Sequence, residues 1–522
     1  MKKLHNANKT CWNCPAIDLA GKVDFRACGQ SVEAFQKNLP EDSDVLVMAE
    51  CRRRPELGLF DPMSITFEEC PEWVEGPYGY MLQNMRVMIL GMDGYLGWTL
   101  ALWLGALGFE VSGIDNYARR VWLMEQGADT AVPIAMMQER LEVAKNVLDL
   151  DINFRRMDIA ARSHLREFVE DVRPEAIVHY AECPSAPFSM IDADHAIEVQ
   201  RNNVLGTLGL LFMIRDTVPE SAMLKLGTMG EYGTPLTGRP LFEGMFPADA
   251  VLHWDDREWS MGGELTPRDP VSFYHVSKVQ DTFNIYESCK YWWLRSYDIM
   301  QGVIYGVHTP QLAADPALRT RFDIDEWFGT VINRFVAQAI VGIPLTIYGA
   351  GEQVRGFIGL QDAMQCMTRL ILSPPEPGQY GVVNQMSGYY SIRELAEKVA
   401  KVGRQEFDLP VQIQRVENPR VEADRHPFEP IFENLPKQYG FEPQVSPEEE
   451  IYRMFELLTQ PHIRKRIQQM MYHIVPRTWW SGEHRRVKTI ELLEDVQAQI
   501  GDDGHEPQRP VPSEQLQILS GE

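Results

Sequence analysis

Tyr274 and Lys278, four residues apart, are the pair whose types and spacing most directly suggest chemistry. On a helix this spacing places both side chains on one face. A lysine ammonium near a phenol favours the phenolate and lowers the pKa of the phenol. Tyr274 could then take the proton of a substrate hydroxyl while hydride leaves the same carbon. The spacing by itself would also fit a pair without a catalytic role, in which the tyrosine packs in the core and the lysine is exposed to solvent.

Thr228 is the third candidate, because it follows the apolar segment Met223–Leu226. We expect it at the carboxyl end of a strand, where parallel sheets bind ligands. There its hydroxyl could bridge Tyr274 and the substrate oxygen.

Three glycines, Gly91, Gly94 and Gly97, form a second pattern upstream. Their spacing suits a tight strand-to-helix turn, close approach of a pyrophosphate, and close packing of helix on strand. The phosphates would lie at the helix N-terminus. Asp115, about 20 residues on, would bond the adenosine ribose, which predicts NAD rather than NADP. Arg119 and Arg120 nearby weaken that preference, and a tight turn without ligand is the alternative.

The elements that must position these residues alternate along the chain. A buried strand, a helix and another strand make a βαβ unit with parallel strands. We therefore predict an α/β fold with a Rossmann-type doubly wound sheet. The predicted strands are Arg86–Gly91, Phe109–Ile114, Ile152–Phe154, Ala176–Tyr180, Met223–Gly227 and Arg295–Val303, and the predicted helices are Trp98–Leu107, Ser163–Val172 and Val204–Thr217.

Three segments divide the chain in this interpretation. Residues 1–84 form a small cysteine-rich extension, and residues 85–460 form the main unit, with the NAD-binding sheet over about 85–320 and a smaller mixed α/β region over 321–460. Residues 461–522 are polar, and we expect the last twenty or so to be disordered.

Longer sequence motifs identify the family more closely. The glycine turn, Asp115, Thr228, Tyr274 and Lys278 resemble extended short-chain dehydrogenases/reductases acting on nucleotide sugars. Over roughly residues 85–445 the chain closely resembles the UDP-sulfoquinovose synthases of that family. The strings that carry this resemblance are Gly94–Trp98, Ser185–Asp192, Asn202–Thr207, Lys225–Pro235, Ser272–Lys278, Gln301–Val307 and Asn418–Glu422.

The resemblance implies that UDP-glucose and sulfite give UDP-sulfoquinovose, with tightly held NAD reused each turnover. It also implies a homodimer built on a four-helix bundle. Asp158 would bond the adenine amino group, although a surface acid is nearly as good an interpretation. Further cofactor contacts are expected at Asp93, Tyr95, Leu96, Asn116, Arg119, Ile159, Ala181, Asn203, Gln301, Tyr274 and Lys278. Substrate contacts are expected at Ser185, Ser189, Thr228, Gln301, Arg334, Arg355 and Arg420, where the three arginines suit a diphosphate.

One departure from the sugar 4,6-dehydratases and two from the family pattern bear on the reaction. Sugar 4,6-dehydratases carry Asp-Glu after the threonine, whereas this chain has Met229-Gly230, so the base at C5 must lie elsewhere. His275 and Glu231 are the candidates for this base, and a packed histidine and a strand-end glutamate are the alternatives.

The family commonly has Glu-Gln-Arg before Ser-Ala-Pro, and Tyr-Leu-Asp-Ile-Arg-Asp further along the chain. Here Pro184 and Gly359 replace the arginine and the first aspartate. An epimerase or dehydratase that does not use sulfite, and a non-catalytic nucleotide-binding regulator, therefore stay as competing hypotheses.

Five of the eight cysteines precede residue 71. The Cys11-Trp-Asn-Cys14 spacing fits one half of a zinc site. Cys28 and Cys51 are the first candidates to complete it, and Cys70 and His5 are the others. An iron–sulfur or redox role, or plain unliganded thiols, would fit the same cysteines. Without a secretory signal we expect a cytoplasmic location, where disulfides are rare.

The composition argues against several classes of protein. Of 522 residues, 44% are hydrophobic and 24% charged, which is typical of a globular protein. With 50 Lys+Arg against 74 Asp+Glu, the net charge of −24 argues against a nucleic-acid partner. No apolar run is long enough to predict a membrane span.

Overall fold

The structure is a computed structural model that describes residues 17–18, 22–23, 85–233, 240–418 and 428–475. The pair β1 (Ile17–Asp18) and β2 (Lys22–Val23) is antiparallel. The proposed zinc ligands Cys11, Cys14, Cys28 and Cys51, the predicted disordered tail and Arg420 all lie outside the described residues.

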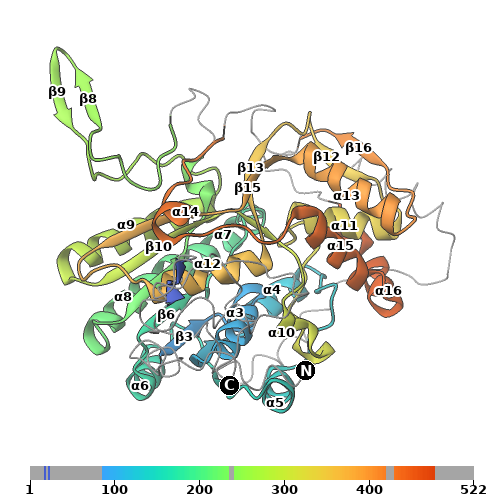
Figure 1. The fold of residues 1–522 in the computed structure, drawn as a ribbon, viewed down its shortest axis with the longest axis horizontal. Helices are drawn as coiled ribbons and strands as arrows, with labels where there is room; N and C mark the ends of the chain where they lie inside the picture. Colours follow the sequence, from blue (N-terminus) through green and yellow to red (C-terminus); the bar gives the residue numbers. More distant parts are fainter. Residues whose placement is uncertain (1–16, 19–21, 24–84, 234–239, 419–427, 476–522) are drawn as a thin grey trace, which may run out of the picture.

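A seven-stranded parallel sheet forms the centre of the molecule (Figure 1). Its strand order is β14-β10-β7-β6-β3-β4-β5, and every neighbouring pair is parallel. The predicted doubly wound sheet is thus confirmed. The strands are β3 (Arg86–Leu90), β4 (Glu110–Asp115), β5 (Asn153–Arg156), β6 (Ala176–His179), β7 (Ala222–Leu226), β10 (Arg295–Gln301) and β14 (Tyr380–Gln385).

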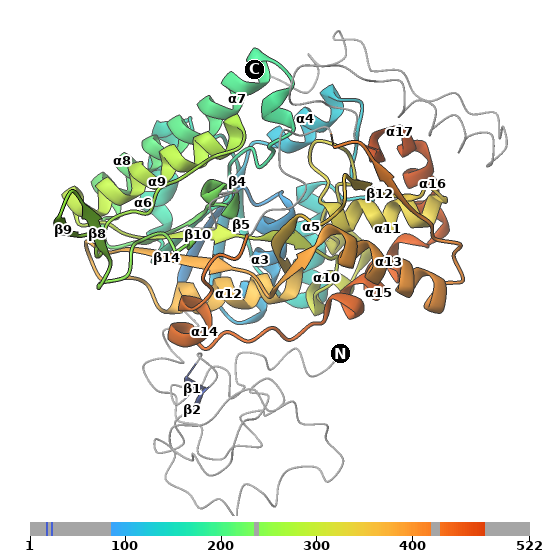
Figure 2. The same ribbon diagram turned by 90° about the horizontal axis from the view of Figure 1, so that it is seen from above.

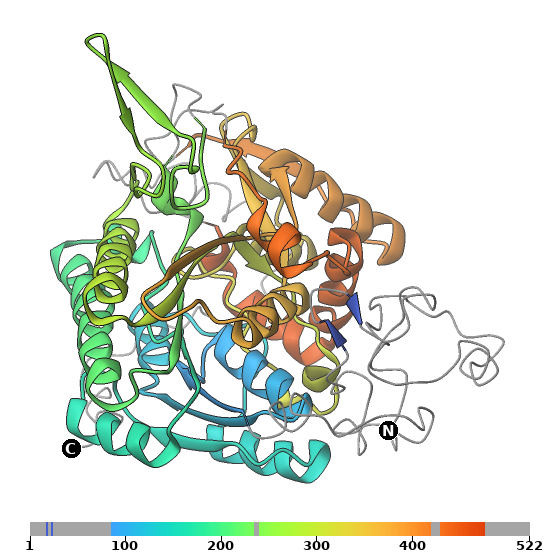
Figure 3. The same ribbon diagram turned by 60° about the vertical axis from the view of Figure 1, so that its left-hand side comes forward.

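Helices cover both faces of this sheet, as Figure 3 shows. One apolar core lies between the sheet and α3 (Tyr95–Ala106), α5 (Met137–Leu148) and α12 (Leu360–Leu372). A second core lies between the other face and α6 (Arg162–Val172), α8 (Gly206–Thr217) and α9 (Phe273–Trp292). Shorter elements complete this part: α4 (Ala118–Glu125), α7 (Ala193–Gln200), α10 (Pro310–Ala313), the 3₁₀ helices at Phe188–Met190, Met229–Tyr232 and Pro316–Leu318, and a π-helical turn at Arg201–Leu205 that precedes α8.

Residues 295–305, predicted as one strand as far as Val303, divide between two sheets. The strand β10 ends at Gln301, and β11 (Val303–Tyr305) pairs with β13 instead. The break falls at Gly302, where a Cβ atom would lie 2.6 Å from the backbone oxygen of Gly356. Only glycine tolerates this approach of two backbones.

A second, smaller region has its own apolar core. It contains the three-stranded sheet β11-β13-β15 and the two-stranded sheet β12-β16. The strands of these sheets are β12 (Leu345–Tyr348), β13 (Val354–Gly359), β15 (Gly388–Ser391) and β16 (Ile413–Val416), and the helices of the region are α11 (Val331–Val341), α13 (Ile392–Glu406), α15 (Pro447–Leu458), α16 (Pro461–Gln469) and α17 (Met471–Ile474). Figure 2 shows most of these helices gathered on one side of the body. The short helix α14 (Asn434–Tyr439) packs instead on β14 and α12 of the larger region.

The antiparallel hairpin of β8 (Val251–Trp254) and β9 (Arg257–Ser260) projects from the body, at the upper left of Figure 1. All residues of both strands are exposed. Positive φ at Asp255 and Asp256 forms the tight turn between them. None of the described helices is long and apolar enough to cross a membrane.

Residues 461–474, which we assigned to a polar C-terminal extension, pack in the core of the smaller region. Ile463 and Ile467 are fully buried there, whereas the basic residues Arg464 and Lys465 of the same helix face solvent. The apolar pair is four residues apart and therefore forms one face of α16.

We expect Ile463→Ala to destabilise the protein by about 2–5 kcal/mol, because it removes buried methylene groups and leaves a cavity. Lys465→Ala, on the exposed face of α16, should change stability by less than about 0.5 kcal/mol. Urea denaturation of both variants would measure the difference. Equal midpoints for the two variants would contradict the packing of α16.

Candidate active site

A cavity of about 500 Å³ opens at the carboxyl ends of β3, β6 and β7. This is where the direction of strand order reverses, the position at which doubly wound sheets bind ligands. Both regions of the molecule line it. The predicted site residues on its wall are Gly91, Gly94, Tyr95, Leu96, Gly97, Asp115, Asn116, Arg119, Ile159, Ala181, Ser185, Thr228, Tyr274, His275, Lys278, Gln301, Arg334 and Arg355.

Five predicted site residues do not line the cavity: Asp93, Asp158, Ser189, Asn203 and Glu231. Their side chains have other partners. Asp158 accepts a hydrogen bond of 2.6 Å from the Asn116 side chain. The Ser189 hydroxyl accepts a 3.0 Å hydrogen bond from the Tyr274 backbone N–H, so it positions the start of α9.

The glycine turn has the geometry expected of a dinucleotide cradle. A Cβ atom at Gly97 would lie 2.1 Å from the Gly91 carbonyl oxygen, so helix α3 can pack on this turn only with glycine there. The N-cap of α3 is Gly94, which supplies no side-chain cap. The N-terminus of α3 therefore faces the cavity with backbone N–H groups suited to a pyrophosphate.

Asp115 ends strand β4 on the cavity wall. Its carboxylate accepts hydrogen bonds from the backbone N–H groups of Asp93 (2.8 Å) and Tyr117 (2.6 Å), which fix its orientation. Burial, and then the negative charge of Asp93, raise the pKa of Asp115 to about 6. A carboxylate held in this way would accept from ribose hydroxyls, so these residues fit the adenosine half of NAD.

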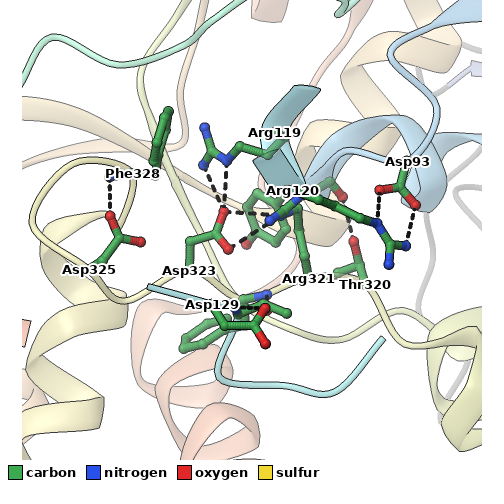
Figure 4. Close-up of polar contacts among 12 residues, drawn as sticks. Asp93, Arg119, Arg120, Asp129, Thr320, Arg321, Asp323, Asp325 and Phe328 are labelled. Atoms are coloured by element: carbon green, nitrogen blue, oxygen red, sulfur yellow. Dashed lines mark hydrogen bonds and ion pairs between the residues drawn. The ribbon is translucent and has the colours of Figure 1, made fainter. Parts of the chain in front are cut away.

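The two arginines beside Asp115 are paired with carboxylates (Figure 4). Arg120 donates two hydrogen bonds of 2.7 Å to Asp93, which the buried Arg140 also contacts at 3.0 Å. Arg119 lies 2.7 Å from Asp323, with its guanidinium 3.6 Å from the centre of the Phe328 ring. Carboxylates neutralise both arginines. Arg119 and Arg120 therefore weaken the predicted preference for NAD over NADP less than the sequence suggested.

Helix α9 carries the tyrosine–lysine pair. Its N-cap Ser272 accepts from the His275 backbone N–H, and Tyr274 and Lys278 are buried one turn apart. The Lys278 ammonium lies 5.7 Å from the centre of the Tyr274 ring. It donates to the Leu226 carbonyl oxygen at 2.6 Å and to the Glu182 carboxylate.

The predicted lowering of the Tyr274 pKa is wrong for this environment. Burial raises the pKa of Tyr274 above its usual range, and the negative charge of Glu182 raises it further. Lys278 does not act as an isolated cation because Glu182 neutralises it. Sequence reasoning did not assign Glu182 a role, although a buried lysine requires a carboxylate partner.

Thr228 lies at the end of β7, as predicted, and is the N-cap of the 3₁₀ helix Met229–Tyr232. Its hydroxyl oxygen accepts from the Gly230 backbone N–H (3.2 Å), and Glu231 accepts from the Thr228 backbone N–H (3.4 Å). Glu231 is fully buried, and burial followed by the charge of Asp298 raises its pKa to about 7. Glu231 therefore orients Thr228 from behind the cavity.

The His275 imidazole lies on the cavity wall, with its Nδ1 2.9 Å from the Ser272 hydroxyl. A Cβ atom at Gly230 would lie 2.2 Å from its Nε2. Gly230 thus provides the space in which the imidazole lies. This explains physically why glycine occupies the position at which 4,6-dehydratases carry an acidic residue.

The smaller region contributes the cations of the far wall. Arg334 of α11 donates to the Gly329 carbonyl oxygen at 2.9 Å, and Arg355 of β13 lies 5.5 Å from the centre of the Phe428 ring. Gln301 donates to Gln385 at 3.0 Å, and the Ser185 hydroxyl contacts the Trp327 carbonyl oxygen. Within the described residues, no group of three or more His, Cys, Asp or Glu could hold a metal ion.

Comparison with known proteins identifies the class first. The model of the NAD dependent epimerase/dehydratase family matches residues 87–280. The fold is shared with UDP-glucose 4-epimerase of Thermotoga maritima (TM-score 0.53, 16% identity, 71% of this chain and 98% of that one). It is also shared with UDP-glucuronic acid 4-epimerase of Bacillus cereus (TM-score 0.52, 18% identity, 72% and 99%). The chain thus has the fold of these enzymes and matches the NAD dependent epimerase/dehydratase family in sequence over residues 87–280.

Two curated relatives then define the family. The UDP-sulfoquinovose synthase of Sulfolobus acidocaldarius is 42% identical over 396 residues, 76% of this chain and 98% of the relative. The chloroplastic UDP-sulfoquinovose synthase of Spinacia oleracea is 41% identical over 341 residues, 65% and 69% of the two chains. The chain belongs to the UDP-sulfoquinovose synthase family, which confirms the predicted family, and NAD is confirmed as the cofactor of the class.

Proposed function

We propose that this chain makes UDP-sulfoquinovose from UDP-glucose and sulfite with bound NAD. The observation that supports this most strongly is one cavity that joins the dinucleotide cradle to Thr228, Tyr274, His275 and Lys278. The names of the relatives in this family give the product, UDP-sulfoquinovose. The non-catalytic alternative is less well supported, because all four groups of the constellation are on the wall of the same cavity.

Tyr274 would act on the C4 hydroxyl of the glucose. NAD, when bound, supplies the acceptor and later the donor of the C4 hydride. Tyr274 takes the hydroxyl proton as the C4 ketone forms and returns it when that ketone is reduced. Thr228 would hold the same oxygen. Lys278 donates one N–H to Glu182 and one to the Leu226 carbonyl oxygen, so its third N–H is left for a ligand.

His275 is the better candidate for the base at C5. The C4 ketone acidifies the C5 proton. The base takes this proton from C5 and passes it to the C6 hydroxyl, which leaves as water. Bisulfite then adds through sulfur to C6, and the proton that it carried passes through the same base to C5. His275 lies on the cavity wall with Nδ1 held by Ser272, so its Nε2 can carry the proton. Glu231 is buried behind Thr228 and does not reach the cavity.

Arg334 and Arg355 would bind the UDP diphosphate from the smaller region, because guanidinium forks match phosphate oxygens. Arg420 stays a predicted third contact. The competing function is a UDP-sugar epimerase or dehydratase without sulfite. Pro184 favours it, since this residue lines the cavity where the family commonly has an arginine.

We further propose a homodimer. The helices α7, α8 and α9 pack beside one another (Figure 2) and expose large apolar side chains. Ile197, Leu205, Phe212 and Phe283 are 41–56% exposed. Apolar side chains on a helical face are typical of subunit interfaces. The cytoplasm remains the predicted location.

Mass spectrometry of the products from UDP-glucose, with and without sulfite, would test the function. We expect a UDP-sugar carrying a sulfonate only when sulfite is present. An epimer or 4-keto sugar formed equally in both reactions would support the competing function and contradict ours.

Replacement of the two candidate bases would separate their roles. His275→Gln should slow exchange of the C5 proton with deuterium from solvent by about 10²–10⁴-fold, the usual contribution of a general base. It should still allow UDP-glucose to reduce the bound nicotinamide. Glu231→Gln should retain the exchange to within about tenfold. The opposite order of effects would assign the base to Glu231.

Phe283→Asp should convert the dimer to a monomer, because it places a charge in the apolar face of α9. Light scattering would measure the molar mass. Val251→Asp, at a similarly exposed apolar residue on the β8–β9 hairpin, is the matched control and should stay dimeric. A monomeric wild-type protein would contradict the homodimer.

A further inference from the structure

The ion pair between Lys278 and Glu182 is a feature that the proposed reaction does not itself explain. Both side chains are only 2% exposed, and the Glu182 carboxylate contacts the Lys278 ammonium directly. Glu182 also lines the cavity. It follows strand β6, so a residue from one strand end is tied to the catalytic lysine of a helix 96 positions further along the chain.

We propose that Glu182 is a positioning residue that holds the Lys278 ammonium and neutralises its charge beside the Tyr274 ring. This inference rests on the proposed function only in assigning the hydroxyl on which Tyr274 acts. An ammonium has three N–H donors. Glu182 and the Leu226 carbonyl oxygen each take one, which leaves a single donor for a ligand.

The backbone around Glu182 is fixed by Asn203. The Asn203 side chain accepts from the Cys183 backbone N–H at 2.8 Å and donates to the Cys183 carbonyl oxygen at 3.2 Å. It also donates to Ser277 on α9 at 3.0 Å, directly before Lys278. Asn203, predicted as a cofactor contact, thus joins the Glu182 segment to the catalytic helix.

Other charges surround the pair. The titratable groups that face Glu182 are Lys278 and Asp281 of α9, Lys225 of β7 and His179 of β6. Those that face Tyr274 are Glu182, Cys183, Lys225, Glu231, and its helix neighbours His275 and Lys278. Burial lowers the pKa of His179 to about 4, so this imidazole is neutral and adds no charge at neutral pH.

Glu182 therefore has two opposing effects on the tyrosine. It places the lysine, which would favour the phenolate, and it neutralises that lysine. Its own negative charge is the largest electrostatic contribution that raises the pKa of Tyr274, after burial. A tyrosine retained as phenol is a proton donor ready for the step that reduces C4, whereas the first step needs the phenolate. Glu182 would thereby shift the balance from the first step, the oxidation of C4, towards the later reduction of C4.

The test compares Glu182→Gln with Glu182→Asp in the full-length protein. Mixing with UDP-glucose in the absence of sulfite reports the first step as absorbance of the reduced nicotinamide. We expect the midpoint of the pH dependence of this rate to fall by about one pH unit or more in Glu182→Gln, because a negative charge near the phenol is removed. Glu182→Asp keeps the charge and should stay closer to the wild-type midpoint.

A second readout needs no cofactor turnover. Titration of tyrosinate absorbance, taken as the difference between each protein and its Tyr274→Phe counterpart, reports Tyr274 directly. It should show the same downward shift in Glu182→Gln. Thermal melting of each variant shows whether it is folded. If Glu182→Gln does not fold, Glu182→Met, which also removes the charge, takes its place and should show the same downward shift.

Unchanged midpoints in folded Glu182→Gln, or equal shifts in the Gln and Asp variants, would overturn the inference. Failure of the proposed function looks different. In that case wild-type protein would not reduce its nicotinamide with UDP-glucose, or would form no sulfonate, while the tyrosinate titration could still show the effect of Glu182.

Discussion

The burial of two lysines beside the carboxyl ends of the strands is the constraint on which the site depends. Lys278 and Lys225 are almost fully buried, and a buried ammonium is tolerated only with carboxylate partners. Glu182 partners the first, and Asp298 and Asp281 lie 3.6 and 4.0 Å from the second. Because Glu182 follows β6 and the other two carboxylates come from β10 and α9, the charges tie α9 to three neighbouring positions in the sheet. Removing one partner would leave a buried charge, so the arrangement is determined as a set.

Glycine then determines what can approach this set of charges. At Gly97 the absence of a side chain lets α3 pack on the strand-to-helix turn, and at Gly230 it makes room for the His275 imidazole. The two positions have different consequences. Gly97 is a property of the whole fold class, because any dinucleotide cradle of this type needs close packing there. Gly230 is specific to the chemistry, since it places an imidazole beside Thr228 and Tyr274.

Patterns along the chain predicted the central strands well, because these strands are short apolar runs buried on both faces. The run Arg86–Leu90 and the strand that ends at Asp115 needed no tertiary information. The edge strand β14 was missed, and so was the break at Gly302, which depends on a backbone 54 residues away. The pKa of Tyr274 was mispredicted for the same reason. Spacing on α9 shows that Lys278 is near Tyr274. The neutralising carboxylate of Glu182, however, comes from the segment after β6, which local patterns do not connect with α9.

The charge at the sugar end of the cavity bears on the second substrate. Sulfite is an anion, the chain carries a net charge of −24, and Pro184 stands where the family commonly has an arginine. Lys278 adds little net charge there because Glu182 neutralises it. In the proposed reaction, however, His275 becomes a cation twice: when it accepts the C5 proton before passing it to the departing hydroxyl, and again when it accepts the proton of bisulfite before passing it to C5. The positive charge thus appears beside the carbon to which sulfite adds at the step that adds it. A site whose cation is created by the reaction itself would hold the anion at the stage that uses it, which offers a physical reason why a permanent arginine at residue 184 is dispensable.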